Sequence, residues 1–282
     1  MKANPLFLNK SESFWGYVRI LSKELGYSKK GASSVSIHTI DNAEKKLKKM
    51  GIKYDLTLLE EVIEYINYRA NILNNIVQYK LMNLDEARDL YEKCLKIHKD
   101  NNFTCSLPLI KQKKEKRIPS YLTCMINILT ELTLRNYCSD NNLIYNHDIS
   151  FVDDPGSFTY ILDSDGYIQK TFSRRFDGVY PSLDSPQIIW EIKEYYNTTS
   201  FGSRVADGVY ESQLDGYEIK EFNFNLKHVF FLDAHFTWWV KGKSYLCRVI
   251  DLLHMGLVDE VVFGKELFEV WPDFLKEHLN NL

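Results

Sequence analysis

The sequence has no stretch that approaches the ~20 consecutive apolar residues of a membrane-spanning helix. It also lacks the charged start and apolar run of a secretory signal, so we expect a cytoplasmic protein with no membrane partner. Its five cysteines are an odd number, lie far apart and never form a Cys-x-x-Cys pair. This pattern argues against a disulfide framework or a zinc site, and it predicts reduced cysteines packed in the interior.

Several common catalytic motifs are absent as well. The chain has no glycine-rich phosphate loop ending in Lys-Ser or Lys-Thr, no Gly-x-Ser-x-Gly elbow and no His-Glu-x-x-His pair. No helicase, ATP-binding or methyltransferase motif is found, and we therefore expect any enzyme here to act as a stand-alone protein.

Neither sign of charge is in large excess. The net charge is −3 over 282 residues, of which 45% are hydrophobic and 26% are charged. This is ordinary globular material, with enough apolar residues for one large core or two modest ones. The net charge does not by itself indicate a polyanionic ligand, although a mildly acidic protein can bind DNA when its basic residues gather on one surface.

The stretch 174–194 carries the most information. It predicts two short apolar strands joined by a turn rich in proline and serine at 181–186. Because successive side chains on a strand alternate between faces, Glu191 and Lys193 are expected on one face and Ile192 on the other.

Folding this turn back brings Asp177, on the first strand, beside Glu191 and Lys193. Burying three charges costs several kcal/mol unless the charges are paired or hold a metal. The pattern therefore predicts a hard divalent cation at this point of the sheet. The alternative is structural: a surface salt bridge between Glu191 and Lys193, with Asp177 as a turn residue before Gly178.

An Asp, a gap, and then Glu-x-Lys after an apolar strand resembles the PD-(D/E)xK nuclease superfamily. Asp177 matches the metal-binding Asp of that motif, and Glu191 and Lys193 match its second half. Phe176 stands where the family usually has proline. Within the superfamily, the chain looks most like a type II restriction endonuclease.

The resemblance implies a Mg²⁺-dependent enzyme that hydrolyses both strands of duplex DNA and leaves 5′-phosphate and 3′-hydroxyl ends. Asp177 and Glu191 would hold the ion through carboxylate oxygens, with the backbone carbonyl of Ile192 as a further ligand. Lys193 would lie beside the attacking water and orient it, help it lose a proton, or stabilise the anionic transition state. A homodimer is expected, because a two-fold dimer is the simplest way to cut both strands of a palindrome.

An apolar helix is predicted after Pro119, and Glu131 is the one acid in its apolar run. Arg135 follows four residues later, and an ordinary i,i+4 ion pair is one interpretation. The other follows from the resemblance, because many members of the superfamily place a helical Glu before the catalytic sheet. Glu131 is accordingly a candidate catalytic residue.

The elements expected around the motif alternate between helix and strand. They are a hairpin at 158–172, the two motif strands, a helix at 202–219, a strand at 229–232, a helix at 245–255 and a strand at 258–263. We expect an α/β fold with a mixed central β-sheet flanked by helices, in the αβββαβ order of restriction endonucleases, and a helical N-terminal region.

Two domains are predicted: residues 1–110 as a helical region for DNA recognition or dimerisation, and residues 111–282 as the catalytic domain. The basic side chains of a polar junction at 100–119 and of the motif itself can neutralise phosphates, and a plain exposed linker is the alternative interpretation of the junction. A Gln-x-x-x-Tyr pattern in the helix after the motif resembles one found in some superfamily nucleases, and the alternative is that these residues serve in packing. The candidate DNA-binding residues are Lys111, Lys113, Lys114, Arg174, Arg175 and Gln213.

Two alternative functions remain open. One is a non-specific or structure-specific nuclease of the same superfamily, such as a repair or phage enzyme. The other is a non-catalytic DNA-binding protein that keeps the fold.

Overall fold

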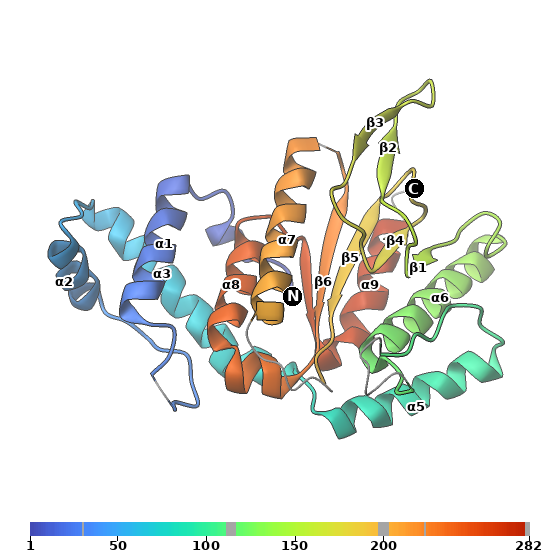
Figure 1. Cartoon of the computed structure of the whole chain (residues 1–282), viewed down its shortest axis with the longest axis horizontal. Helices are drawn as coiled ribbons and strands as arrows, with labels where there is room; N and C mark the ends of the chain where they lie inside the picture. Colours follow the sequence, from blue (N-terminus) through green and yellow to red (C-terminus); the bar gives the residue numbers. More distant parts are fainter. Residues whose placement is uncertain (30, 111–116, 197–202, 223, 280–282) are drawn as a thin grey trace.

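The computed structural model describes residues 1–29, 31–110, 117–196, 203–222 and 224–279. It is a mixed α/β structure in which helices cover both faces of a five-stranded sheet, and further helices form the N-terminal region (Figure 1). The mixed sheet, its flanking helices and the helical N-terminal region confirm the coarse fold class expected from the sequence.

The N-terminal region begins with three helices, each capped by a polar side chain. Ser11, Thr39 and Asp55 each accept a hydrogen bond from the backbone N–H three residues later, which satisfies one of the unpaired groups at a helix start. The buried faces of these helices form their own apolar core. The elements are η1 (Pro5–Phe7), α1 (Glu12–Leu25), α2 (Ile40–Met50) and α3 (Leu56–Ile72).

A continuous helical path leads from α3 towards the sheet. The π-helical η2 (Leu73–Val77) and the short α4 (Gln78–Lys80) connect α3 to α5 (Leu84–Asp100). A capping box of Asn83 and Glu86 starts α5, which packs against α6 (Tyr121–Asn141) rather than against α1 to α3.

The main sheet has the strand order β1-β4-β5-β6-β7. The strands are β1 (Val152–Asp153), β4 (Gly178–Tyr180), β5 (Ile188–Lys193), β6 (Lys227–Leu232) and β7 (Glu260–Phe263). β4 is antiparallel to β1 and β5, whereas β5, β6 and β7 run parallel. The two motif strands predicted from the sequence are β4 and β5.

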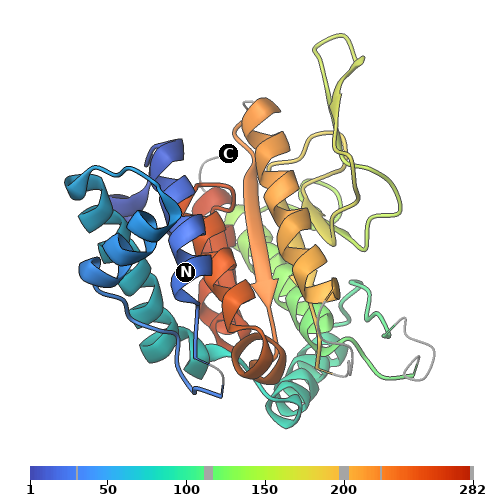
Figure 2. The ribbon, with the colours of Figure 1, turned by 60° about the vertical axis from the view of Figure 1, so that its left-hand side comes forward.

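The predicted hairpin forms, but outside the main sheet. β2 (Tyr160–Leu162) and β3 (Ile168–Thr171) pair only with each other and project beyond the sheet (Figures 1 and 2). The third antiparallel strand of the sheet is instead β1, a two-residue strand that the sequence pattern missed. The side chains of β3 are mostly exposed, so this hairpin has no apolar face with which to join the core.

The two faces of the sheet are covered by different helices. Trp190 and Ile192 of β5 share a core with α6 and α9, whereas Phe230 and Leu232 of β6 share one with α7 and α8. The remaining elements are α7 (Ser203–Phe222), η3 (His235–Lys241), α8 (Lys243–His254), η4 (Gly264–Glu266) and α9 (Leu267–Leu279). Side chains of β5 that alternate with Trp190 and Ile192 therefore face α7.

Gly178 explains how β4 packs so closely on β5. A Cβ at this position would overlap the indole ring of Trp190, which is fully buried. The glycine therefore allows the residue before it, Asp177, to lie against the backbone of β5.

A buried ion pair joins the N-terminal helices to α8. Nη1 of Arg69 on α3 lies 2.8 Å from both carboxylate oxygens of Asp251 on α8. Tyr65 also donates to Asp251 at 2.7 Å, and Arg69 donates to Ser22 at 2.9 Å. The two parts of the chain are thus connected by a charged network as well as by apolar contacts (Figure 2).

The cysteines and the helices also bear on the predictions made from the sequence. All five cysteines are buried and unpaired, as predicted. Among the described residues, none of the helices has both the length and the apolar character needed to cross a membrane.

Candidate active site

The register of β4 and β5 brings Asp177 beside Glu191. The Asp177 N–H donates to the carbonyl of Trp190 at 3.1 Å, and the Ile192 N–H donates to Oδ2 of Asp177 at 2.7 Å. These bonds hold the Asp177 carboxylate against the edge of β5, next to the fully buried Glu191.

Lys193 completes the predicted trio. Its Nζ lies 3.0 Å from Oε2 of Glu191, on the same face of β5, whereas the Ile192 side chain points into the core under α6 and α9. Because the side chains alternate as a strand requires, the structure brings Asp177, Glu191 and Lys193 together.

Arg174 is the centre of the ion-pair network around this trio. Its Nη1 lies 2.6 Å from Oε1 of Glu191 and 2.8 Å from Oδ2 of Asp215, and its Nη2 lies 3.3 Å from Oε2 of Glu191 and 3.4 Å from Oε2 of Glu211. Lys193 also reaches Glu211, at 2.8 Å. We call Arg174, Asp177, Glu191, Lys193, Glu211 and Asp215 the acid cluster.

Glu211 and Asp215 are members of the cluster that the sequence pattern did not reveal. They lie one turn apart on α7, so both face the sheet. At Gly216 the helix lies close to the segment that follows α8, and an added Cβ there would overlap Leu257. Two acids at i and i+4 in the helix after the Glu-x-Lys strand were the signal that could have found them.

The cluster contains more negative than positive groups. Its four carboxylates, if all ionised, would exceed the charges of Arg174 and Lys193 by two. Burial raises the pKa of Asp177 to about 7, and the charge of Glu191 contributes to the rise. Burial likewise raises the pKa of Asp215 to about 7, although Arg174 opposes the shift. Protons held at neutral pH by these two acids partly offset the excess of negative charge.

The surroundings favour the charged forms of both Glu191 and Lys193. Burial raises the pKa of Glu191, but the charges of Lys193 and Arg174 outweigh it and the pKa is lowered. Burial lowers the pKa of Lys193, but the negative charges of Glu191 and Asp177 outweigh it and the pKa is raised. These neighbours therefore favour the ammonium form of Lys193.

The donor chemistry of the cluster suits a hard divalent cation. All candidate side-chain ligands are carboxylate oxygens, and the excess of two negative charges in the fully ionised cluster matches the charge of Mg²⁺. Asp215 is fully buried, and its Oδ1 has no hydrogen-bond partner among the described residues. Within those residues, however, no three His, Cys, Asp or Glu side chains are arranged to hold an ion. Both oxygens of Glu191 accept from Arg174 or Lys193, so a cation would have to replace one of these bonds.

Glu131 is not brought to the acid cluster. Both oxygens of its buried carboxylate accept from the Thr104 N–H, and Oε2 also accepts from the Cys105 N–H at 2.7 Å. Arg135 donates to Oε1 at 2.7 Å, which is the i,i+4 pair of the first interpretation. The pair is buried at Glu131 rather than exposed on the helix surface, and its partners fix the segment before α6.

Glu194, which the alternation of β5 turns to the other face, caps α6. Its Oε2 accepts from the N–H and the hydroxyl of Thr123 at 3.1 and 3.0 Å. This carboxylate therefore has a partner outside the acid cluster.

The predicted DNA-binding residues lie in different places. Lys111, Lys113 and Lys114 are outside the described residues. Arg175 is exposed. Gln213 is two residues from both Glu211 and Asp215, about 200° around α7, so it points away from the acid cluster.

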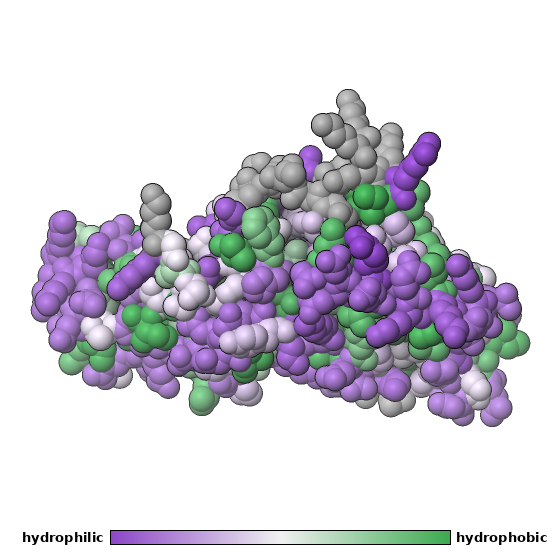
Figure 3. Space-filling view, turned by 90° about the horizontal axis from the view of Figure 1, so that it is seen from below, coloured by the Kyte–Doolittle hydropathy of each residue, from purple (hydrophilic) through white to green (hydrophobic). Residues whose placement is uncertain are grey.

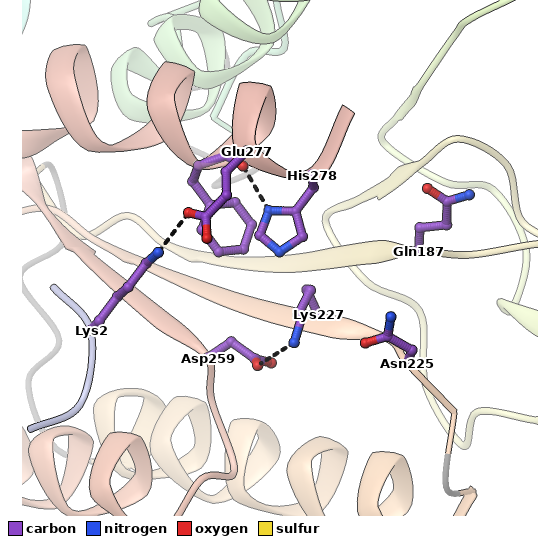
Figure 4. Close-up of a pocket in the computed structure, with 8 residues that line it drawn as sticks. Lys2, Gln187, Asn225, Lys227, Asp259, Glu277 and His278 are labelled. Atoms are coloured by element: carbon purple, nitrogen blue, oxygen red, sulfur yellow. Dashed lines mark hydrogen bonds and ion pairs between the residues drawn. The ribbon is translucent and has the colours of Figure 1, made fainter. Parts of the chain in front are cut away.

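A separate cavity lies at the opposite end of the parallel strands (Figure 4). It has a volume of about 680 Å³ and is lined by residues at the starts of β5 and β6, before β7 and at the end of α9. Its charged groups are already paired: Lys2 with Glu277 at 2.6 Å and Lys227 with Asp259 at 3.3 Å. The cavity contains no part of the acid cluster.

Comparison with known proteins finds two family models. One, described as Domain of unknown function (DUF7687), matches residues 82–278, and the other, described as Domain of unknown function (DUF7690), matches residues 1–76. The two matches meet near η2 and α4, whereas the sequence pattern placed the division near residue 110. No curated protein and no solved structure matches the chain significantly.

Proposed function

We propose that this chain, which belongs to the DUF7687 family, is a divalent-metal-dependent endonuclease that hydrolyses phosphodiester bonds of duplex DNA. The observation that carries the proposal is the meeting of Asp177, directly before β4, with Glu191 and Lys193 on the neighbouring β5. A buried trio of this kind is costly to stability, and a catalytic role gives a reason for it.

The order of the elements supports membership of the PD-(D/E)xK superfamily. α6 precedes the antiparallel strands β1, β4 and β5, and α7 then crosses to the parallel strand β6. We propose that these elements correspond to the αβββαβ core, with β5 as the strand that carries Glu-x-Lys. A type II restriction enzyme acting in the cytoplasm as a homodimer is the specific form of the proposal.

The carboxylates of Asp177 and Glu191 would hold the cation, with Asp215 as a further candidate ligand. A bound Mg²⁺ would supply the Lewis acid that lowers the pKa of a coordinated water and stabilises charge on the phosphoryl oxygens. Asp177 is already oriented by the Ile192 N–H, so its other oxygen needs little reorganisation to bind. The Ile192 carbonyl, implied as a ligand by the resemblance, stays a prediction.

The surroundings of Lys193 favour two of its three proposed roles. The charges of Glu191 and Asp177 raise its pKa, which favours action as a charged donor over acceptance of a proton from the attacking water. Lys193 orients that water and donates to the developing negative charge through charge-assisted hydrogen bonds.

Arg174 is positioned so that it can release a carboxylate partner and bind a phosphate group instead. A guanidinium matches the geometry of phosphate oxygens bidentately, and Arg174 forms ion pairs with three acids. We propose that it contacts the scissile phosphate after releasing Glu191, which then becomes free to bind the cation.

Cleavage of a supercoiled plasmid with Mg²⁺ and with EDTA tests the proposed function. We expect discrete bands with Mg²⁺ and none with EDTA, because a sequence-specific enzyme cuts at fixed sites. A smear would indicate a non-specific nuclease of the same superfamily. Uncut plasmid that shifts on a gel would contradict the proposal and indicate a DNA-binding protein without activity.

The raised pKa of Asp177 predicts a pH dependence. At a Mg²⁺ concentration below saturation, the cleavage rate should rise with pH until about 7 and then level off, because only the ionised carboxylate binds a cation. The free energy of unfolding of the metal-free protein should instead fall as pH rises. A carboxyl with a raised pKa binds its proton more tightly in the folded chain, so its contribution to stability is lost as pH rises from about 4 to about 7.

The control for this prediction is the Asp177→Asn variant. Buried His228 and His254, whose pKa values are lowered by burial, give the opposite slope in both proteins and cancel in the comparison. The variant should gain stability relative to the wild type between about pH 5 and about pH 7, measured by urea unfolding in EDTA. A constant difference across this range would contradict the prediction.

A further inference from the structure

A basic groove lies among the N-terminal helices, remote in sequence from the acid cluster. It is a hollow of about 650 Å³ formed by the end of α1, the following loop and the outer face of α2. Its charged lining residues are Glu24 and four lysines, namely Lys29, Lys45, Lys46 and Lys49. Figure 3, which views the molecule from below, shows hydrophilic side chains over most of this end of the molecule.

The positive charge of the groove is largely uncompensated. Glu24 lies 3.8 Å from Lys46, which leaves that pair neutral. Among the described residues, no carboxylate forms an ion pair with Lys29, Lys45 or Lys49. The C-terminal dipole of α2 favours a lysine at position 49, but it does not account for Lys45 or for Lys29 in the loop.

The wall opposite α2 is held in place by two asparagines of the α3–η2 segment. Asn67 accepts from the His38 N–H and donates to the His38 carbonyl, both at 2.8 Å. Asn74 makes the same pair of bonds to Val35, at 2.8 and 3.0 Å. These bonds fix the loop before any ligand arrives, and a groove that is already formed loses less free energy on binding.

The acid cluster does not itself attract DNA, so a positively charged surface elsewhere on the protein has to provide the affinity. Its excess of negative charge repels phosphate groups, so it adds little to the affinity for DNA until a cation is bound. Affinity for a polyanion comes from lysines and arginines that release counterions from the phosphate backbone. The groove offers three lysines of this kind, with no carboxylate partner among the described residues, on a rigid surface.

We propose that this groove binds the phosphate backbone of nucleic acid and provides much of the affinity for the substrate. The choice of duplex DNA as the ligand rests on the proposed endonuclease function. The network of Arg69 and Asp251 holds the groove at a fixed position relative to α8 and the sheet, so that DNA bound here has a defined orientation (Figure 1).

The test compares two double variants of equal charge. Lys45→Gln with Lys49→Gln removes two lysines from the groove. Lys48→Gln with Lys53→Gln removes two exposed lysines beside it. Lys48 pairs with Glu44 at 3.6 Å, and neither lysine of the control pair lines the groove. Binding of a fluorescein-labelled duplex of about two helical turns is measured by anisotropy in EDTA, so that no DNA is cut.

We expect the groove variant to bind the duplex roughly tenfold to a hundredfold more weakly at ~50 mM KCl. The slope of log K against log salt concentration should become shallower by about 0.9 for each phosphate that is no longer neutralised, or by about 2 in all. The control variant should bind within about threefold of the wild type, since neither lysine lines the groove and only side chains that neutralise phosphates release counterions.

Three results would overturn the inference. They are equal weakening by both variants, an unchanged salt slope in the groove variant, and a groove variant that binds polyglutamate more weakly but DNA as well as before. The last result would assign the groove to an acidic protein partner.

Wild-type chain that binds the duplex through the groove but never cuts plasmid with Mg²⁺ would refute the proposed activity alone. Plasmid cleavage with unchanged DNA affinity in the groove variant would refute the groove alone.

Discussion

Replacing Lys193 with alanine should lower the rate of plasmid cleavage at saturating Mg²⁺ by about 10³-fold. The ammonium group lies 3.0 Å from Glu191 and 2.8 Å from Glu211, and it is the only cation of the Glu-x-Lys motif. Its removal takes away a charged donor that is held in place before the transition state forms, and such donors contribute about 10²- to 10⁴-fold to rates.

The control for this prediction is Lys227→Ala. Lys227 is also a strand lysine with a carboxylate partner, but it opens β6 at the opposite end of the sheet. This variant should cut at the wild-type rate. Thermal unfolding of both variants shows whether the loss of activity reflects unfolding, and Lys193→Arg, which keeps the charge, separates charge from shape. If Lys193→Ala, while folded, digests plasmid at the unmodified rate, the proposed mechanism is wrong.

Replacing Asp251 with alanine should lower the free energy of unfolding by about 3–5 kcal/mol. Arg69 is 1% exposed, and both of its contacts to Asp251 are 2.8 Å long. The variant leaves a buried guanidinium with no carboxylate and leaves the Tyr65 hydroxyl without its acceptor. An unpaired buried charge is one of the few changes that destabilise a protein by this amount.

Glu61→Ala provides a matched control on the same helix as Arg69. Glu61 pairs with Lys10 at 2.7 Å, but the pair is partly exposed, and its loss should cost less than about 1 kcal/mol. Urea unfolding measures both variants. Adding Arg69→Met to Asp251→Ala should recover stability, because it removes the uncompensated charge. A decrease no larger than that of Glu61→Ala would show that the network contributes little.

Much of the acid cluster could be predicted because its first three members are local. Asp177 directly precedes β4, and Glu191 and Lys193 lie on β5, which a short turn joins to β4. The alternation of side chains along β5 places Glu191 and Lys193 on the same face. The helices and strands that follow were also predictable, since apolar periodicity depends only on neighbouring residues.

The direction in which Glu211 and Asp215 point could not be predicted from neighbouring residues alone. The sequence places them on a helix, but their direction depends on how α7 rotates about its axis when Val205 and Val209 enter the core and Gly216 meets Leu257.

Two further residues make the same point. Arg174 was expected to contact DNA, whereas the structure pairs it with Glu191 of β5 and with Glu211 and Asp215 of α7. Glu131 was assigned to the catalytic site by resemblance, whereas the backbone of the segment before α6 provides its partners. Apart from Glu191, these partners come from segments whose position the local pattern does not specify.

The sequence by itself determined the helical N-terminal region, the pair of motif strands and the meeting of two carboxylates with one lysine. Tertiary structure alone decided that the predicted hairpin stands apart from the sheet, that α7 adds two more acids, and that Arg69 and Asp251 join the two parts of the chain. The physical reason is the distance along the sequence over which each effect acts. Strand alternation and helical periodicity act between residues a few positions apart, whereas ion pairs between distant elements exist only after the apolar core has fixed how those elements lie.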